Sequence, residues 1–184
     1  SLTIGGCRVD EVAAQFGTPV FVYDEAHLRS RCQEAVATFG AGNAYYATKA
    51  FLCTAMARLA YEEGMGLDVA SGGELFTALR AGVPSSALAF HGNNKSLAEL
   101  RMALAEEVGH IVVDSFDEID RLEALHAEGR TPTPRVLARL TPGVHAHTHE
   151  FIATGQDDSK FGFNLGNGDA ARAIDRLRRS SAVE

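Results

Sequence analysis

The sequence predicts an α/β fold in which repeated βα units surround a parallel sheet. Short runs of β-branched, aromatic and apolar residues alternate with longer stretches of helical periodicity. Three of the helical stretches begin with one pattern, a serine followed three residues later by a glutamate. The chain has 184 residues, of which 46% are hydrophobic and 22% are charged, so a packed globular core is expected.

Six strands are predicted, and the first of them lies before the regular repeat. Their ranges are residues 20–23, 44–48, 67–70, 87–90, 110–114 and 135–140. Counting from residue 44 gives five βα units, with the helix of the fifth at about residues 168–181. The chain lacks an initiator methionine and stops where a sixth strand should begin, so we expect both ends to be cut ends.

The helical stretches are amphipathic and are expected to pack on the sheet. Three apolar stripes are predicted to be core: Leu52, Met56, Leu59 and Ala60; Leu97, Leu100, Leu104 and Val108; Ile119, Leu122 and Leu125. The three serine–glutamate pairs predict capping boxes: Ser71 with Glu74, Ser96 with Glu99, and Ser115 with Glu118. They mark the loops at the carboxyl ends of the strands, where a parallel barrel carries its active site.

The net charge of −7 and the pI near 5.5 argue against a nucleic-acid or anionic-membrane partner, because both need a basic surface. One basic cluster is interpreted as the solvated face of a late helix: Arg172, Arg176, Arg178 and Arg179. No apolar run is long enough for a membrane span. The three cysteines have no CxxC spacing, which indicates free thiols and a cytoplasmic protein.

Lys49 lies at the end of the predicted strand at residues 44–48, within YYATKA. Apolar surroundings favour the neutral amine, which is the form that bonds to a carbonyl carbon. On position alone, a strand-end lysine that extends into solvent is the commoner case.

The next predicted strand contains Asp68 and is followed by two glycines and Glu74, within LDVASGGEL. Glycines after a strand let the backbone approach a ligand, and an acid there could bind a cofactor. Glu74 has a second interpretation, as the capping glutamate of the helix that follows.

A polar loop, HGNNKS, follows the strand at residues 87–90 and contains His91, Asn93 and Asn94. These side chains could contact a substrate carboxylate or amine. The alternative is a loop held by asparagine turns and a serine cap.

The segment from Arg139 to residue 163 includes His145, His147 and His149 in alternation, followed by Glu150. On spacing alone, the histidines could line one side of a strand and bind a metal ion, as in a metal-dependent hydrolase. No second group of ligands stands out elsewhere, so no metal is predicted.

Together these segments resemble the bacterial diaminopimelate decarboxylases, especially those of actinobacteria. The matching motifs are YYATKA at residues 45–50, LDVASGGEL at 67–75, HGNNKS at 91–96, HIVVDS at 110–115 and RLTPGVHAHTHEFIATGQDDSKFGF at 139–163. The similarity extends from Gly17 onward. The last motif is the most specific, because it separates this family from arginine and ornithine decarboxylases and from alanine racemases.

The resemblance implies an enzyme dependent on pyridoxal 5'-phosphate, with a (β/α)8 TIM-type barrel and a β-domain, that is homodimeric and converts meso-2,6-diaminopimelate to L-lysine and CO2. Lys49 matches the lysine that carries the cofactor; Asp68, Glu74 and Arg139 match residues near it. His91, Asn93, Asn94, His147 and Lys160 are expected on the substrate side or in the adjoining loops.

The resemblance covers an incomplete barrel of about five units, without the family's β-domain. Residues 1–24 are expected to lead into the barrel and residues 25–184 to form its pyridoxal-binding part. The family's phosphate loop and most of its substrate-binding residues lie beyond residue 184, so the chain alone is expected to be inactive. Two alternatives stay open, an inactive truncated barrel that acts as an interaction module and a related amino-acid decarboxylase that uses the same cofactor.

Overall fold

The computed structural model describes residues 2–129, 131–143 and 161–184. Its centre is a parallel sheet of five strands in the order β3-β4-β5-β6-β7. The strands are β3 (Tyr45–Ala47), β4 (Gly66–Val69), β5 (Leu88–Phe90), β6 (His110–Val113) and β7 (Val136–Ala138). Each predicted strand from residue 44 onward is therefore confirmed; β4 is shifted by one residue and the other four are shorter than predicted. Every adjacent pair is parallel and consecutive, as in a succession of βα units.

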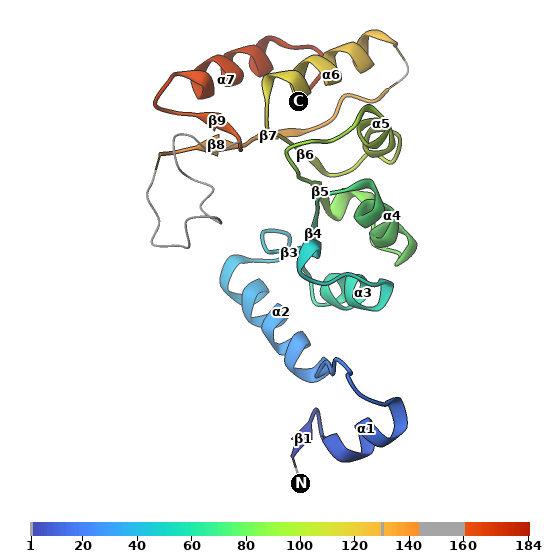
Figure 1. Cartoon of the computed structure of the whole chain (residues 1–184). Coiled ribbons are helices and arrows are strands. Elements are labelled where there is room, and N and C mark those ends of the chain that lie inside the picture. Colours follow the sequence, from blue (N-terminus) through green and yellow to red (C-terminus); the bar gives the residue numbers. More distant parts are fainter. Residues whose placement is uncertain (1, 130, 144–160) are drawn as a thin grey trace.

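Helices cover one face of the sheet and follow its curve (Figure 1). They are α3 (Thr54–Glu62), α4 (Gly72–Arg80), α5 (Leu97–Ala105) and α6 (Phe116–Ala127). Leu67, Val69 and Phe90 lie in the core that the sheet shares with these helices. Since side chains alternate along a strand, Asp68 and its paired residue Ala89 lie on the opposite face, which in a complete barrel is the interior. On that face Leu137 is 50% exposed.

The predicted apolar stripes are largely buried. All the predicted residues of α6, with Leu100, Leu104 and Val108 from the α5 unit, are buried. Leu97 is 48% exposed, and its assignment to the core was wrong. It is the first residue of α5, so it lies at the end of the helix, before the buried positions Leu100 and Leu104.

The serine caps are confirmed at all three helix starts, but a reciprocal capping box forms only at Ser96 and Glu99. Glu74 accepts a hydrogen bond from the N–H of Ala70, and Glu118 accepts one from the N–H of Asp114. Both donors lie one residue before the cap. The turns from β4 to α4 and from β6 to α6 are so short that this earlier N–H, the first beyond the strand, is within reach.

The predicted strand at residues 20–23 was wrong, because these residues belong to no strand. They lie between the first and second helices of the N-terminal elements. Those elements are the hairpin of β1 (Thr3–Ile4) and β2 (Cys7–Arg8), helix α1 (Val9–Phe16) and helix α2 (Glu25–Phe39). Tyr23 stacks on Phe51 with ring centroids 4.5 Å apart, which joins this connection to the loop after β3.

The strand predicted at residues 135–140 is divided at Arg139. Its N–H donates to Val113 of β6, whereas its carbonyl accepts from Phe163. Beyond it, β8 (Leu140–Thr141) pairs with β9 (Phe163–Asn164), and α7 (Asp169–Arg179) follows. At the far end, Glu184 exchanges two hydrogen bonds with Pro134 and Val136, in the pattern of a next parallel strand.

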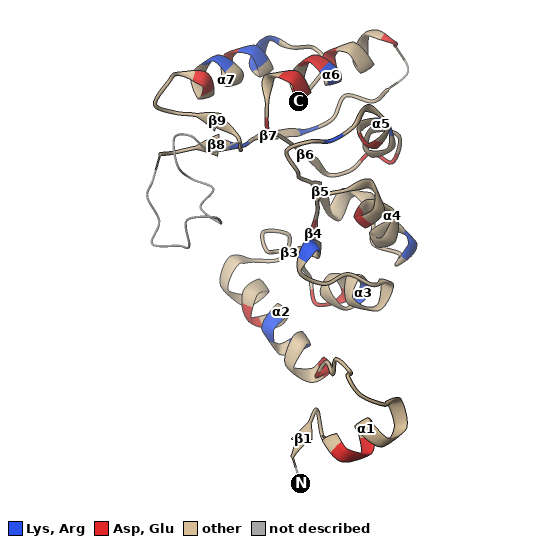
Figure 2. Ribbon diagram, in the orientation of Figure 1, with Lys and Arg blue, Asp and Glu red and all other residues tan. Residues whose placement is uncertain are grey.

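Basic and acidic residues are interspersed along α6 and α7 (Figure 2). Arg176 contacts Asp120 at 2.6 Å and Glu123 at 2.5 Å, so part of the late arginine cluster ties α7 to α6. Within the three described ranges, no helix is long and apolar enough to cross a membrane.

Candidate active site

Five polar residues lie at the carboxyl edge of the sheet, one from each strand. Lys49 follows β3, Asp68 lies near the end of β4, His91 and Asp114 directly follow β5 and β6, and Arg139 follows β7. The strand register places the carboxyl ends of the strands side by side, because Ala47 pairs with Asp68 and Val113 pairs with Ala138. In parallel βα folds this edge is where ligands bind.

Lys49 lies in a short 3-10 turn, η1 (Thr48–Ala50), that is held from both sides. The buried hydroxyl of Thr48 lies 2.7 Å from Glu74 Oε2 and 3.0 Å from the Asp68 carbonyl. Beyond the turn, the Tyr46 hydroxyl donates to the Phe51 carbonyl at 2.7 Å. The backbone at Lys49 is therefore fixed while its side chain is exposed.

Glu74 connects the ends of two strands. Its Oε2 accepts from the N–H of Ala70 at 2.7 Å as well as from Thr48. Of the two interpretations that the sequence allowed, the reciprocal cap is wrong for Glu74. The side chain braces the turn that carries Lys49.

Asp68 and His91 face each other across β4 and β5. The His91 Nδ1 lies 3.4 Å from both carboxylate oxygens of Asp68, which is an ion pair only when the ring is protonated. Asp68 Oδ1 and His91 Nε2 are shielded from solvent and have no hydrogen-bond partner among the described residues. Buried polar atoms usually have partners, so this pair indicates a place for polar groups of a ligand.

The loop after β5 is shaped by Gly92 and Lys95. A Cβ at Gly92, where φ is +108°, would lie 2.9 Å from the Ala70 carbonyl oxygen, so the close approach of the two loops requires glycine. Lys95 is buried, with its Nζ 2.6 Å from the Gly92 carbonyl. Asn93 and Asn94 are exposed and form no side-chain hydrogen bond with described residues, so the predicted asparagine turns do not hold this loop.

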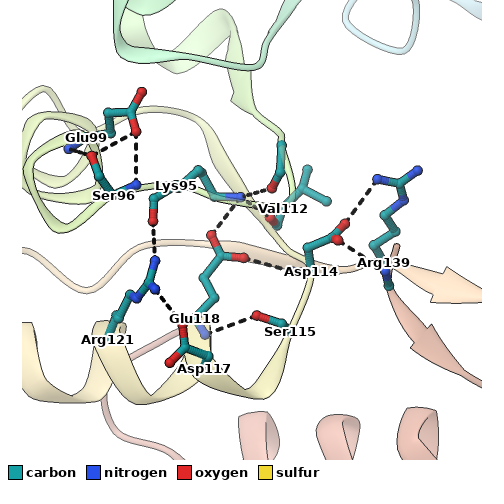
Figure 3. Close-up of polar contacts among 12 residues, drawn as sticks. Lys95, Ser96, Glu99, Val112, Asp114, Ser115, Asp117, Glu118, Arg121 and Arg139 are labelled. Atoms are coloured by element: carbon teal, nitrogen blue, oxygen red, sulfur yellow. Dashed lines mark hydrogen bonds and ion pairs between the residues drawn. The ribbon is translucent and has the colours of Figure 1, made fainter. Parts of the chain in front are cut away.

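Asp114 holds Arg139 at the other end of the edge (Figure 3). Its Oδ1 lies 3.1 Å from Arg139 Nη1, and its Oδ2 accepts from the N–H of Gly162 at 3.1 Å. The Arg139 guanidinium also lies over the Phe161 ring, 4.4 Å from its centroid. Both oxygens of the buried carboxylate are thus used to fix Arg139 and the backbone before β9.

Residues 25–184 match the family model described as pyridoxal-dependent decarboxylase, pyridoxal binding domain. The chain belongs to this decarboxylase family. The match agrees with the cofactor that the sequence resemblance implies, and with a lysine at the carboxyl edge of a parallel sheet.

Relatives within the decarboxylase family are closely similar along the whole chain. The diaminopimelate decarboxylase of Bacillus methanolicus is 50% identical over 100% of this chain and 43% of its own length. That of Mycobacterium leprae is 51% identical over 95% of this chain and 37% of its own length. The chain therefore spans about two fifths of these relatives.

A solved structure gives the same result for the fold. Diaminopimelate decarboxylase of M. jannaschii in co-complex with L-lysine aligns with a TM-score of 0.83 at 33% identity, covering 97% of this chain and 43% of that one. The incomplete barrel predicted from the sequence is confirmed as a partial copy of that fold.

The sequence did not predict several polar contacts that support the site at the carboxyl edge of the sheet. These contacts are made by Thr48, Lys95, Asp114 and Glu118. Asp114 lies within the motif HIVVDS and Lys95 within HGNNKS, whereas Glu118 lies in the first turn of α6. The position of Asp114 directly after a strand was the available signal. The contacts of these residues join different βα units and cannot be read from local spacing.

Several predicted residues of the site lie outside the described residues, namely His147, Lys160 and the histidines of the metal hypothesis, His145 and His149. Among the residues that are described, no group of three or more histidine, cysteine or acidic side chains could hold a metal ion.

Proposed function

We propose that the complete gene product containing this chain is a pyridoxal-phosphate-dependent decarboxylase that converts meso-2,6-diaminopimelate to L-lysine and CO2, with Lys49 as the cofactor-bearing residue. The observation that carries the proposal is the position of Lys49. Its exposed side chain leaves a turn that Thr48 and Glu74 hold in place, and the neighbouring strands supply Asp68 and His91, each of which has a polar atom without a partner among the described residues. The substrate follows from relatives that bear the name diaminopimelate decarboxylase at about half identity.

The described residues fit the cofactor. Its aldehyde needs an accessible amine, which Lys49 offers, and its polar ring substituents need buried partners, which Asp68 Oδ1 and His91 Nε2 offer. Arg139 adds a fixed positive charge at the same edge. When bound, the cofactor supplies an electron sink for the electron pair left when CO2 departs.

In this proposal the protein's own residues orient and shield the reacting groups. Thr48 and Glu74 hold the turn so that Lys49 Nζ extends from a fixed point. A Lys49 amine that is released by an incoming substrate amine can carry a proton to the α-carbon of the product. Asn93, Asn94, His147 and Lys160 are proposed to contact the substrate or to belong to the loops around it.

The proposal includes the setting of the enzyme. The complete protein is a cytoplasmic homodimer in which residues 1–24 lead into the barrel and residues 25–184 form the pyridoxal-binding part. The three free cysteines support a reducing compartment. Size-exclusion chromatography with light scattering measures the assembly.

The test is CO2 release by the complete gene product with added cofactor, using meso-diaminopimelate, lysine, ornithine and arginine as separate substrates. We expect release from diaminopimelate and a loss of at least about a hundredfold in Lys49→Ala, because the anchor and the proton carrier are both removed. Arg101→Met is the control, since it removes an exposed ion pair with Glu128 far from the edge. Faster release from ornithine or arginine would indicate a related decarboxylase, and no release from any of the four would support an inactive module.

A further inference from the structure

Lys95 is a buried charged residue that has no role in the proposed chemistry. The residue is 2% exposed, and its ammonium has three partners: the Gly92 carbonyl at 2.6 Å, the Val112 carbonyl at 2.8 Å and Glu118 Oε1 at 2.6 Å. Arg121 fixes its backbone by donating to the Lys95 carbonyl at 2.6 Å. The two carbonyl contacts are hydrogen bonds and the Glu118 contact is an ion pair, so the buried ammonium is held entirely by groups of this chain.

Glu118 passes the contact from Lys95 to the next strand. Its Oε2 accepts from the N–H of Asp114 at 2.8 Å, while its Oε1 faces Lys95. Burial raises the pKa of the Glu118 carboxyl above its ordinary value, and the Lys95 ammonium opposes that effect. Lys95 therefore stabilises the charged form of Glu118, while the nearby Asp114 carboxylate opposes it.

Asp114 completes a connection to the carboxyl edge, because its side chain holds Arg139 (Figure 3). Lys95, Glu118, Asp114 and Arg139 thus form one chain of contacts, which we call the Lys95–Arg139 relay. It contains two positive and two negative groups. Its first member lies in the core, and its last lies at the proposed site, where the side chain of Arg139 is 25% exposed.

Stability alone does not account for this arrangement. A buried ion pair is often no more stabilising than apolar residues of the same volume, whereas removing one partner leaves an uncompensated charge. Without Lys95, two neighbouring carboxylates would share Arg139 as their one cation in the relay. The guanidinium would then be drawn toward the core side of Asp114.

We infer that Lys95 is a positioning residue, which acts through Glu118 and Asp114 to hold the Arg139 guanidinium in place for the anionic cofactor or substrate. The inference rests on the proposed function and deepens it, because it names what orients one of the proposed cofactor-side residues. Lys95 itself touches neither cofactor nor substrate.

The test is a double-mutant cycle in the complete gene product with Lys95→Met and Arg139→Met. For each variant we would measure the dissociation constant of pyridoxal phosphate, its bound absorbance spectrum, and kcat and KM per bound cofactor. We expect Lys95→Met to weaken cofactor binding about tenfold, and to change it less than about twofold when Arg139 is already methionine. Arg101→Met, which breaks an exposed pair between the same two helical units, should match the wild type.

A second variant, in which the net charge of the relay is balanced again, separates an effect on the position of Arg139 from damage to the fold. Glutamine at position 118 keeps an oxygen for the Asp114 N–H but carries no charge, so Lys95→Met with Glu118→Gln should recover most of the lost cofactor affinity. If Lys95→Met does not fold, Glu118→Gln alone takes its place in the cycle. This substitution removes the negative partner of Lys95 and so also changes the charge balance of the relay.

The inference is overturned if the effects of positions 95 and 139 are additive, or if neither Lys95→Met nor Glu118→Gln changes cofactor affinity more than about twofold. These results leave the proposed function intact when the wild type releases CO2 and forms its adduct at Lys49. A wild type that binds no cofactor would instead overturn the proposed function, and the inference with it.

Discussion

At the scale of single residues, Thr48, which directly follows β3, contacts one strand and one helix through its hydroxyl. Its partners are the Asp68 carbonyl of β4 and the Glu74 carboxylate of α4, and its own backbone leads directly into Lys49. A buried hydroxyl in this position does more than fill space. It sets where the proposed anchor leaves the sheet.

Replacing Thr48 by valine keeps the shape and removes the hydroxyl. We expect Thr48→Val to lower the free energy of unfolding by about 1–3 kcal/mol, because Glu74 loses a partner in a buried setting, and to weaken cofactor binding. Chemical denaturation and cofactor titration of the complete protein measure the two effects. Thr38→Val is the matched control, since that exposed hydroxyl contacts only the carbonyl of Glu34 in its own helix, and should change stability by less than about 0.5 kcal/mol. Equal effects of the two substitutions would contradict the role given to Thr48.

At the scale of elements, Glu99 joins two neighbouring βα units. Its Oε2 accepts from the Ser96 N–H at the start of α5, and its Oε1 accepts from the Gly72 N–H at the start of α4. These backbone donors lower the pKa of the Glu99 carboxyl below its ordinary value of 4.5. The ionised side chain therefore caps two helices at once.

This pKa shift gives a pH dependence of known sign. Below pH 4.5 the unfolded chain binds the proton more readily than the folded chain does, so the contribution of Glu99 is present above that pH and is lost as the pH falls through the lower folded value. We expect Glu99→Gln to be less stable than the wild type at neutral pH, and the difference to shrink on acidification. Thermal unfolding from pH 7 to pH 3 measures it. A difference that stays constant or grows toward low pH would show that the shift has been assigned to the wrong carboxyl.

The sequence was sufficient for elements whose signals are local. Apolar runs located the strands from β3 to β7, and the serine caps located the starts of α4, α5 and α6, because each depends on residues close together in the chain. The division at Arg139 was missed, since it follows from a change of hydrogen-bonding partner between β6 and β9. The residues at 20–23 have strand-like composition, but no neighbouring strand pairs with them, and pairing is not a local property.

The same distinction applies to the site. Lys49, Asp68, His91 and Arg139 were found by their places after or near the ends of strands, and the structure brings them to one edge. The partners that fix them were not found, because Thr48 contacts a residue 26 positions away and Asp114 contacts Gly162, 48 positions away. Such contacts depend on how the units pack around the sheet.

At the scale of the whole molecule, five βα units form one continuous arc (Figure 1), and the polar residues of the candidate site lie at the carboxyl edge of its sheet. The core that the sheet shares with its helices is closed, whereas Leu137 on the opposite face is half exposed. The chain spans about two fifths of its relatives, so the proposed activity belongs to the complete gene product, and this part of it contributes the proposed anchor, Lys49.

Whether Lys49 bears the cofactor is tested by borohydride reduction of the complete protein with pyridoxal phosphate, followed by peptide mass spectrometry. We expect one modified lysine per chain, at Lys49, and no modification there in Lys49→Ala. Lys95 is an internal comparison, because its ammonium is buried and held by three groups of the chain, and it should stay unmodified. An adduct at another lysine, with Lys49 unmodified, would show that Lys49 is not the anchor.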